Sequence, residues 1–181
     1  LEKRSHAYGI VMAGIYNTGG VDWLSMYTMG LAKRGLIGMF MFNGGPGGVV
    51  PYGGTRGFFG TNPMSYAIPT NDNPILVDMA TSEIPFFEYS RAKKAQKPLS
   101  KAARVTEEGI LTKDPENGRE EYEARLLPMG GGYKGYAINL LIEILTGNLV
   151  RSISGGNKKS PEYVTHEYGG LLIAFDIASF T

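Results

Sequence analysis

The sequence contains no cysteine, which excludes both a disulfide framework and a thiolate metal site. Chains without disulfides are typical of reducing compartments, so we expect a cytoplasmic protein. The two histidines, His6 and His166, are too isolated in the sequence to indicate a metal site. A net charge of +1 gives no electrostatic reason to expect nucleic acid or an anionic membrane as a partner. No apolar run approaches the roughly 18 residues that span a bilayer.

What the chain does contain predicts a single domain over residues 1–181. Its apolar content of 43 % against 19 % charge is enough to bury a core and argues against disorder. Glycine is the outlier, because its 26 residues are clustered at positions that call for positive φ or close backbone approach. The opening Leu1–Arg4 reads like the middle of a helix, which predicts truncation or processing.

Two segments organise the middle of the chain. Gly60–Pro69 contains a turn and then a predicted strand at Met64–Ile68. A second apolar run, Ile75–Val77, ends at Asp78, a carboxylate at the end of a strand. From the residues alone, two interpretations stay open: a hairpin closed by an Asx-type turn, or a functional edge of a sheet.

The first part of the chain alternates between strand and helix patterns. A helix is expected to stop at Gly9, followed by a strand at Ile10–Tyr16, an amphipathic helix at Val21–Arg34 and a strand at Leu36–Phe42. This order suggests a parallel crossover, as in a Rossmann-like sheet. However, Asn17–Gly20 does not supply the G-x-G-x-x-G that opens a dinucleotide-binding helix.

Two glycine-rich stretches invite an interpretation as phosphate-binding loops. Asn43–Gly48 is not a Walker A motif, since no Lys-Ser/Thr pair follows at the right offset, and composition alone favours a flexible surface loop. Gly130–Gly132 instead precedes a predicted helix start at Tyr133–Gly135, and the helix continues through an apolar face at Tyr136–Leu145 and is expected to end at Gly147. Glycines at a helix start expose N–H groups that bind anions, and Lys134 adds a cation, although a solvated surface lysine is the alternative.

The remaining segments are predicted from start and stop signals. Ser82–Gln96 reads as a helix whose aromatic residues pack in the core. The polar stretch Thr106–Glu123 is expected to be rich in loops, Arg151–Thr165 a mobile loop, and Gly169–Ile177 the last strand.

Three motifs together resemble the type-2 malate/lactate dehydrogenase family, which includes sulfolactate and ureidoglycolate dehydrogenases and cyclic-imine reductases. They are GTNP at 60–63, VDMATS at 77–82 and PMGGGYKGYAINLLIEILTG at 128–147, and the match runs nearly end to end in order and spacing. The resemblance implies an α+β fold with a mostly antiparallel sheet flanked by helices, which binds NADH or NADPH without a Rossmann fold. It also implies that the chain is the central cofactor-binding domain, lacking the family's N-terminal region and C-terminal part.

The resemblance also implies which residues contact NAD or NADP. Asn43-Gly44 stands where family members often carry Asn-Ser, so a hydroxyl contact is lost and a backbone contact remains. The full set of implied cofactor-binding residues is Asn43, Gly44, Asp78, Met79, Ala80, Thr81, Lys134 and Gly135.

No residue of the chain is assigned as the catalytic acid. Reduction of a carbonyl or imine needs a proton donor, most often histidine near neutral pH. His6 and His166 are interpreted as surface residues. The family places one histidine in a Ser-His-Gly motif that this chain does not contain, and another in an Asn-x-x-His pattern that aligns with Gly20. The nearest titratable residue, Asp22, is interpreted as an acid at a helix N-terminus.

Two functions therefore stay open. The first is an NAD(P)H-dependent oxidoreductase that transfers hydride between the nicotinamide and a small 2-hydroxy or 2-oxo acid or a cyclic imine. The alternative is a catalytically degenerate relative or an excised fragment that acts as a binding or assembly domain. Because the family forms dimers, a homodimer is expected, or a partner chain that supplies the missing regions.

Overall fold

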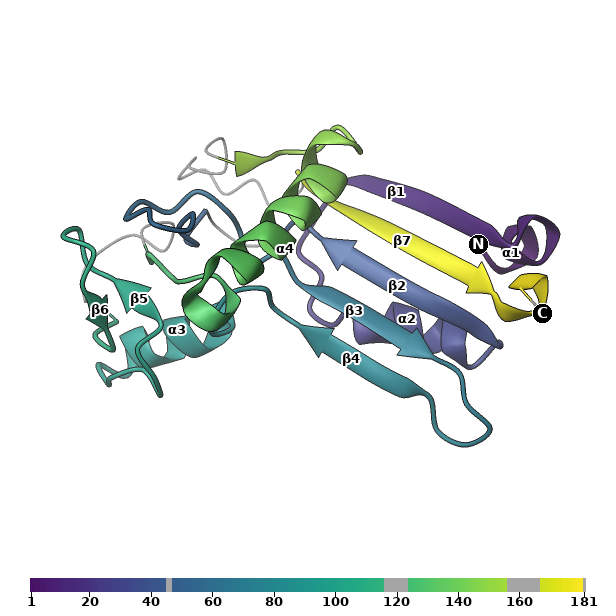
Figure 1. Ribbon diagram of the computed structural model, residues 1–181, viewed down its shortest axis with the longest axis horizontal. Helices are drawn as coiled ribbons and strands as arrows, with labels where there is room; N and C mark the ends of the chain where they lie inside the picture. Colours follow the sequence, from purple (N-terminus) through teal and green to yellow (C-terminus); the bar gives the residue numbers. More distant parts are fainter. Residues whose placement is uncertain (45–46, 116–123, 156–166, 181) are drawn as a thin grey trace.

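The computed structural model describes residues 1–44, 47–115, 124–155 and 167–180. Its centre is a five-stranded sheet in the order β1-β7-β2-β3-β4, and every neighbouring pair of strands is antiparallel (Figure 1). The predicted α+β class with an antiparallel sheet is therefore confirmed. The strands of this sheet are β1 (Ile10–Thr18), β2 (Leu36–Phe42), β3 (Met64–Ile68), β4 (Ile75–Met79) and β7 (Tyr168–Asp176).

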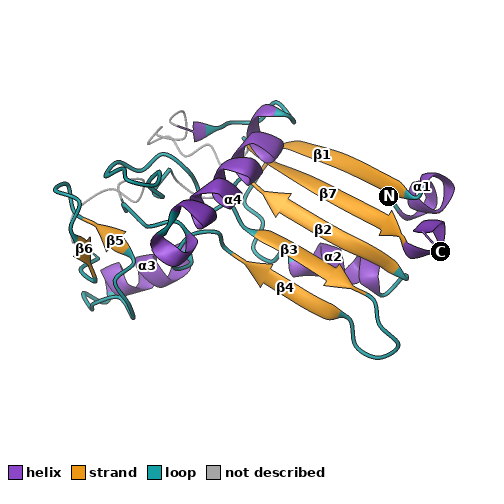
Figure 2. Ribbon diagram, in the orientation of Figure 1, coloured by secondary structure: helices purple, strands orange, loops and turns teal. Residues whose placement is uncertain are grey.

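Helices flank this sheet, and a second, two-stranded sheet lies to one side (Figure 2). The small sheet pairs β5 (Arg104–Val105) with β6 (Leu111–Thr112). The α-helices are α1 (Glu2–Tyr8), α2 (Ser25–Ala32), α3 (Phe86–Lys94) and α4 (Tyr133–Glu143). Among the described helices, none combines the length and the apolar character needed to cross a bilayer.

The strand–helix–strand unit at the start of the chain does join two parallel strands, but they are not neighbours. Both β1 and β2 run antiparallel to β7, which lies between them. The last strand of the chain has therefore been inserted into the β1–α2–β2 unit. The alternation of strand and helix patterns along the chain suggested a Rossmann-like sheet, in which such strands are neighbours. This local pattern contains no information about β7, which begins more than a hundred residues after β2.

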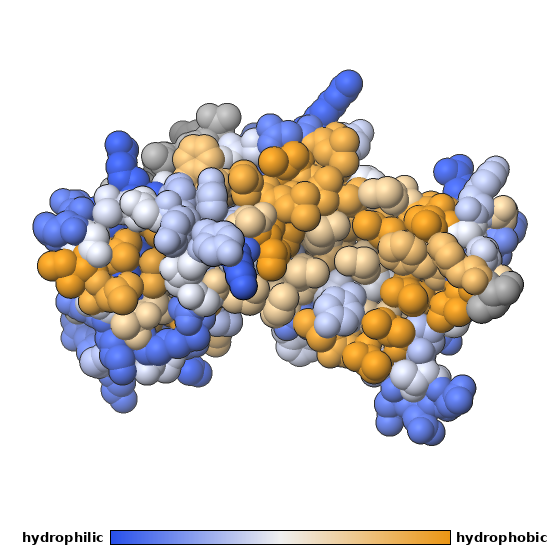
Figure 3. All heavy atoms as spheres, in the orientation of Figure 1, coloured by the Kyte–Doolittle hydropathy of each residue, from blue (hydrophilic) through white to orange (hydrophobic). Residues whose placement is uncertain are grey.

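The two faces of the sheet are covered differently. Helix α2 packs on one face, where Leu24 and Leu31 meet Leu36, Phe40 and Leu172. Helix α4 crosses the opposite face near one end, and its Ile142 packs against Met41 and Leu171 (Figure 1). The rest of that face is apolar and open to view in Figure 3. One row of paired residues crosses all five strands there and contains Met12, Ile173, Met39, Tyr66 and Val77.

Several helix boundaries differ from the sequence-based predictions. Helix α2 begins at Ser25 rather than Val21, and α3 begins at Phe86 because Pro85 before it is extended, with φ −62° and ψ 147°. Gly147 does not end the helix that starts at Tyr133: a π-helical turn continues through Asn148. A Cβ at Gly147 would lie 2.7 Å from Ser154 Cβ, so this glycine permits close packing instead.

Parts of two predicted loops lie outside the described residues. These parts are residues 116–123 of the polar stretch and residues 156–165 of the expected mobile loop, and His166 also lies outside the described residues.

Candidate functional site

A cleft of about 440 Å³ opens where the end of β4 meets the segment before α2 and the start of α3. Four of the eight residues predicted to contact a cofactor lie together in its lining: Gly44, Asp78, Met79 and Ala80. The remaining lining residues are Gly20, Val21, Asp22, Trp23, Phe42, Thr61, Pro63, Pro85 and Phe86. The tertiary structure thus brings four segments to one place: the start of the glycine-rich stretch Asn43–Gly48, the GTNP and VDMATS motifs, and the loop between β1 and α2.

The Asp78 side chain is held by the start of α2. Its Oδ2 accepts a hydrogen bond from the backbone N–H of Ser25, the first helical residue, at 2.8 Å. The first turn of α2 contains no acidic residue, so the interpretation of Asp22 as the helix acid is wrong. Asp22 precedes the helix and lines the cleft, and the acid that satisfies the helix N-terminus comes from β4.

A buried polar network ties the GTNP turn to α4. Asn62 Nδ2 donates to Glu143 Oε2 at 2.7 Å and to Asn139 Oδ1 at 3.0 Å. Asn139 Nδ2 in turn donates to the Gly60 carbonyl and to Thr81 Oγ1, both at 3.1 Å. These contacts fix the GTNP and VDMATS motifs against one face of helix α4. Each motif lines the cleft, through Thr61 and Ala80 respectively.

The sequence analysis did not predict that Asn62, Asn139 and Glu143 form the buried network that holds the cleft-lining motifs in place. A signal was present, because Asn139 and Glu143 are polar residues four positions apart in an otherwise apolar helical run. Residues at that spacing lie on one helix face. Both are buried in the structure, with 0 % and 3 % exposure.

Asn43 and Thr81, two predicted cofactor residues, are fully buried and absent from the cleft lining. Thr81 Oγ1 donates to the Asn62 carbonyl at 2.9 Å, and Asn43 Nδ2 donates to the Ile153 carbonyl at 2.5 Å. Their side chains therefore hold backbone segments in place behind the cleft.

Lys134 and Gly135 are not in the lining of the cleft. The segment before α4 is joined to the end of the β4 motif, because the Met129 N–H donates to the Thr81 carbonyl at 2.9 Å. Lys134 is exposed in the first turn of α4, whose N-terminus has no side-chain cap. Gly135 is buried, and a Cβ there would overlap the Met129 carbonyl oxygen.

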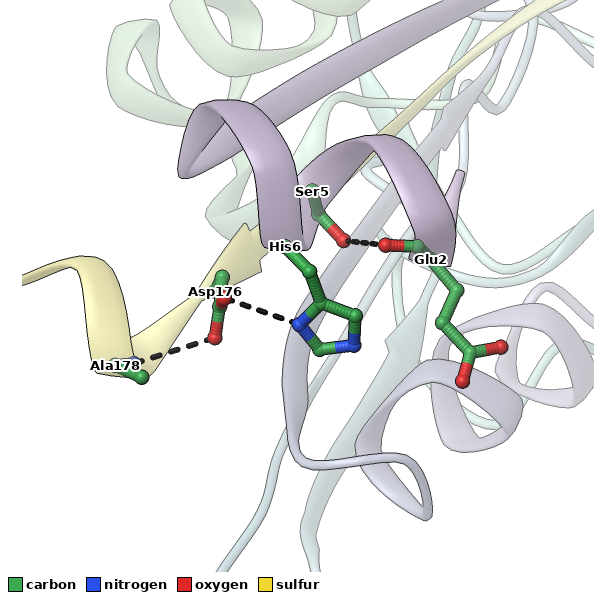
Figure 4. A network of polar contacts seen from close by, with 5 residues as sticks. All are labelled: Glu2, Ser5, His6, Asp176 and Ala178. Carbon is green, nitrogen blue, oxygen red and sulfur yellow. Dashed lines mark hydrogen bonds and ion pairs between the residues drawn. The ribbon is translucent and has the colours of Figure 1, made fainter.

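The described lining of the cleft contains no histidine. Gly20 lines it, and a Cβ at that position would have no other atom within 4 Å. His6 lies in α1, before the start of β1, where its Nδ1 pairs with Asp176 Oδ2 at 3.0 Å (Figure 4). Since Gly20 follows the end of β1, the 9 residues of that strand separate them by about 30 Å. Within the described residues, no group of three or more His, Asp or Glu side chains is placed to hold a metal ion.

The fold and the cleft define an α+β domain with a candidate site at one edge of an antiparallel sheet. A family model described as malate/L-lactate dehydrogenase matches residues 2–181, and the chain belongs to this family. Malate dehydrogenase of Pyrococcus horikoshii is 35 % identical over 176 residues, covering 92 % of this chain and 46 % of that protein.

Two further relatives indicate the breadth of the family. (2R)-3-sulfolactate dehydrogenase (NADP(+)) of Chromohalobacter salexigens is 33 % identical over 155 residues, covering 83 % of this chain and 45 % of that protein. The crystal structure of delta1-piperideine-2-carboxylate reductase from Pseudomonas syringae superposes with a TM-score of 0.82 at 28 % identity, covering 96 % of this chain and 52 % of that chain. This chain thus spans about half the length of the relatives it matches.

Proposed function

We propose that this chain is the cofactor-binding part of an NAD(P)H-dependent oxidoreductase acting on a small 2-hydroxy or 2-oxo acid or a cyclic imine. The observation that carries the proposal is a single cleft, lined by Asp78, Met79 and Ala80 of the VDMATS motif and by Gly44, which stands where family members often carry serine. The relatives named above act, by their names, on hydroxy acids and on a cyclic imine carboxylate. Reduction would consume one hydride from the cofactor and one proton from a donor.

Two parts of the chain would hold the dinucleotide: the cleft would take its nicotinamide ring, and the start of α4 would take its phosphates. The cleft has the volume and the aromatic border suited to a planar ring, in Trp23, Phe42 and Phe86. The uncapped N-terminus of α4, preceded by Gly130 and Gly131 with φ of 69° and 62°, offers N–H groups and Lys134 to phosphates. When bound, the nicotinamide supplies the hydride, while this chain's residues orient the ring and hold the phosphates. Asn43, Thr81 and Gly135 would act by shaping the backbone around it.

The direct test is a titration of the chain with NADH and with NADPH, following nicotinamide fluorescence. We expect saturable binding, weakened by Lys134→Ala and not by Lys3→Ala, an exposed lysine in α1. Asp78→Ala should also weaken binding. Because this change also removes the acceptor for Ser25, Asp78→Asn serves as the variant that keeps an acceptor oxygen. Absence of binding to either dinucleotide up to millimolar concentration would contradict the proposal.

A second candidate function is a catalytically degenerate relative that binds the dinucleotide without turnover. The observation that favours it is Gly20, which lines the cleft at the position that the family motif gives to histidine. Binding without oxidation of NADH or NADPH in the presence of small 2-oxo acids would support this alternative.

We also propose that a second copy of the chain completes the assembly. Strand β1 lies at the edge of the sheet and contains neither charge nor proline over Ile10–Thr18, whereas edge strands of monomers are usually protected by such residues. Ile10 and Met12 on this strand are 43 % and 54 % exposed. Sedimentation should give a dimer that Met12→Lys converts to monomer, while the matched Lys33→Met at the exposed end of α2 should not change it. A monomeric wild-type chain at tens of micromolar would contradict this proposal.

A further inference from the structure

The cleft has a composition that distinguishes between charged and neutral ligands. Its described lining contains three aromatic residues, Trp23, Phe42 and Phe86, and two carboxylates, Asp22 and Asp78, but no lysine, arginine or histidine. A carboxylate attracts a cation and not a neutral ring, and an aromatic face adds a cation–π attraction to the stacking that it gives to either ring.

The two carboxylates differ in how far they are already engaged. Asp78 Oδ2 accepts the Ser25 N–H at 2.8 Å, so part of its charge is directed to the helix start. Asp22 is exposed and makes no hydrogen bond or ion pair with any described residue. Its carboxylate is therefore the principal uncompensated charge of the cleft.

Trp23 follows Asp22 directly in the chain, lines the same cleft and is 69 % exposed, so an indole and a carboxylate border one opening. Indole is the aromatic side chain that attracts cations most strongly. A carboxylate and an exposed indole that line one cleft are a combination suited to a planar organic cation, whereas Phe42, at 1 % exposure, belongs to the core behind the cleft.

We propose that this cleft selects the cationic pyridinium ring of the oxidised cofactor over the neutral dihydropyridine ring of the reduced one, through Asp22 and Trp23. This inference rests on the proposed function and assigns the redox form that the site prefers. The expected preference is about tenfold in dissociation constant, which corresponds to one favourable charge interaction at a partly exposed site. A tenfold preference lowers the reduction potential of the bound two-electron couple by about 30 mV.

The chain offers an internal probe, because Trp23 is its only tryptophan. The experiment titrates the chain with the 1-methylnicotinamide cation and with neutral nicotinamide, following Trp23 fluorescence and repeating the measurement by calorimetry. We expect the cation to bind about ten times more tightly than the neutral ring. Asp22→Asn should remove most of this difference, and Asp22→Glu should keep it. The matched control, Asp72→Asn, changes an exposed acid in the turn between β3 and β4 and should leave it unchanged.

Equal binding of the two rings, or tighter binding of the neutral ring, would overturn the inference, as would a preference that survives in Asp22→Asn. If neither ring binds while NADH or NADPH still binds in the nicotinamide-fluorescence titration, the inference fails and the proposed function stands. If neither the rings nor the dinucleotides bind, the proposed function fails and the inference fails with it. Circular dichroism of Asp22→Asn guards against misfolding, which is not expected for an exposed side chain without partners among the described residues.

Discussion

Asp78 and Ser25, 53 residues apart in the sequence, meet in a single hydrogen bond of 2.8 Å between the Asp78 carboxylate and the Ser25 backbone N–H. The bond joins strand β4 to the first turn of helix α2, whose N-cap residue, Leu24, has no side-chain oxygen to offer. One carboxylate thus satisfies a helix end and at the same time borders the cleft. Asp78 of the VDMATS motif therefore stabilises the start of α2 as well as lining the cleft.

Asp78→Ala should lower the free energy of unfolding by about 1 kcal/mol, because an N–H at the start of α2 loses its acceptor. In a chain of this size the melting temperature should fall by about 2–4 °C. Asp78→Asn should lose less, since its amide oxygen can accept the same bond. Urea unfolding followed by circular dichroism measures this, with Asp72→Ala as the exposed control; equal midpoints for Asp78→Ala and wild type would contradict it.

Asn139→Ala should destabilise the chain by about 2–4 kcal/mol, because Asn62 Nδ2, Thr81 Oγ1 and the Gly60 carbonyl each lose a buried partner. The matched change Asn148→Ala, at an exposed asparagine in the π-helical turn that continues the same helix, should stay within about 0.5 kcal/mol of wild type. Chemical denaturation of both variants distinguishes the two sites, and similar losses would show that the buried network adds little.

Gly135→Ala should cost about 3 kcal/mol or displace the segment before α4, since the added Cβ overlaps the Met129 carbonyl oxygen. Gly132→Ala is the control: its backbone is extended, with φ −121°, and the nearest atom to an added Cβ lies 3.7 Å away. Calorimetric melting of the two variants is the measurement. A Gly135→Ala protein as stable as Gly132→Ala would mean that the close approach is not required.

Gly20→His should raise the rate of 2-oxo acid reduction by about 100-fold at neutral pH, because an imidazolium would then stand in the cleft as a proton donor. Space is available for the new side chain, since a Cβ at this position would have no other atom within 4 Å. The gain should fall as pH rises above about 6.5, where imidazole loses its proton. Gly20→Asn, which fills the same space without donating a proton in this way, is the control. No gain over Gly20→Asn, measured by loss of nicotinamide absorbance, would contradict the prediction.

The strands were the most predictable elements. Leu36–Phe42 and Met64–Ile68 were predicted with the bounds that β2 and β3 have, because short apolar runs between turns carry a strong local signal. Helix starts were less predictable, since α2 depends on a carboxylate from a distant strand. Of the predicted site residues, Gly44, Asp78, Met79 and Ala80 lie in the cleft lining, whereas their chain neighbours Asn43 and Thr81 are buried and bond with the backbone.

The sequence by itself determined the apolar runs that became strands, the glycines at close backbone approaches, and the motifs that identify the family. These are local properties, set by side-chain periodicity and backbone freedom. Only the tertiary structure decided that β7 enters between β1 and β2, that Asp78 supports α2, and that Gly20, Asp22 and Trp23 border the same cleft as Asp78. Each of these depends on contacts between residues far apart in the chain, which no local pattern encodes.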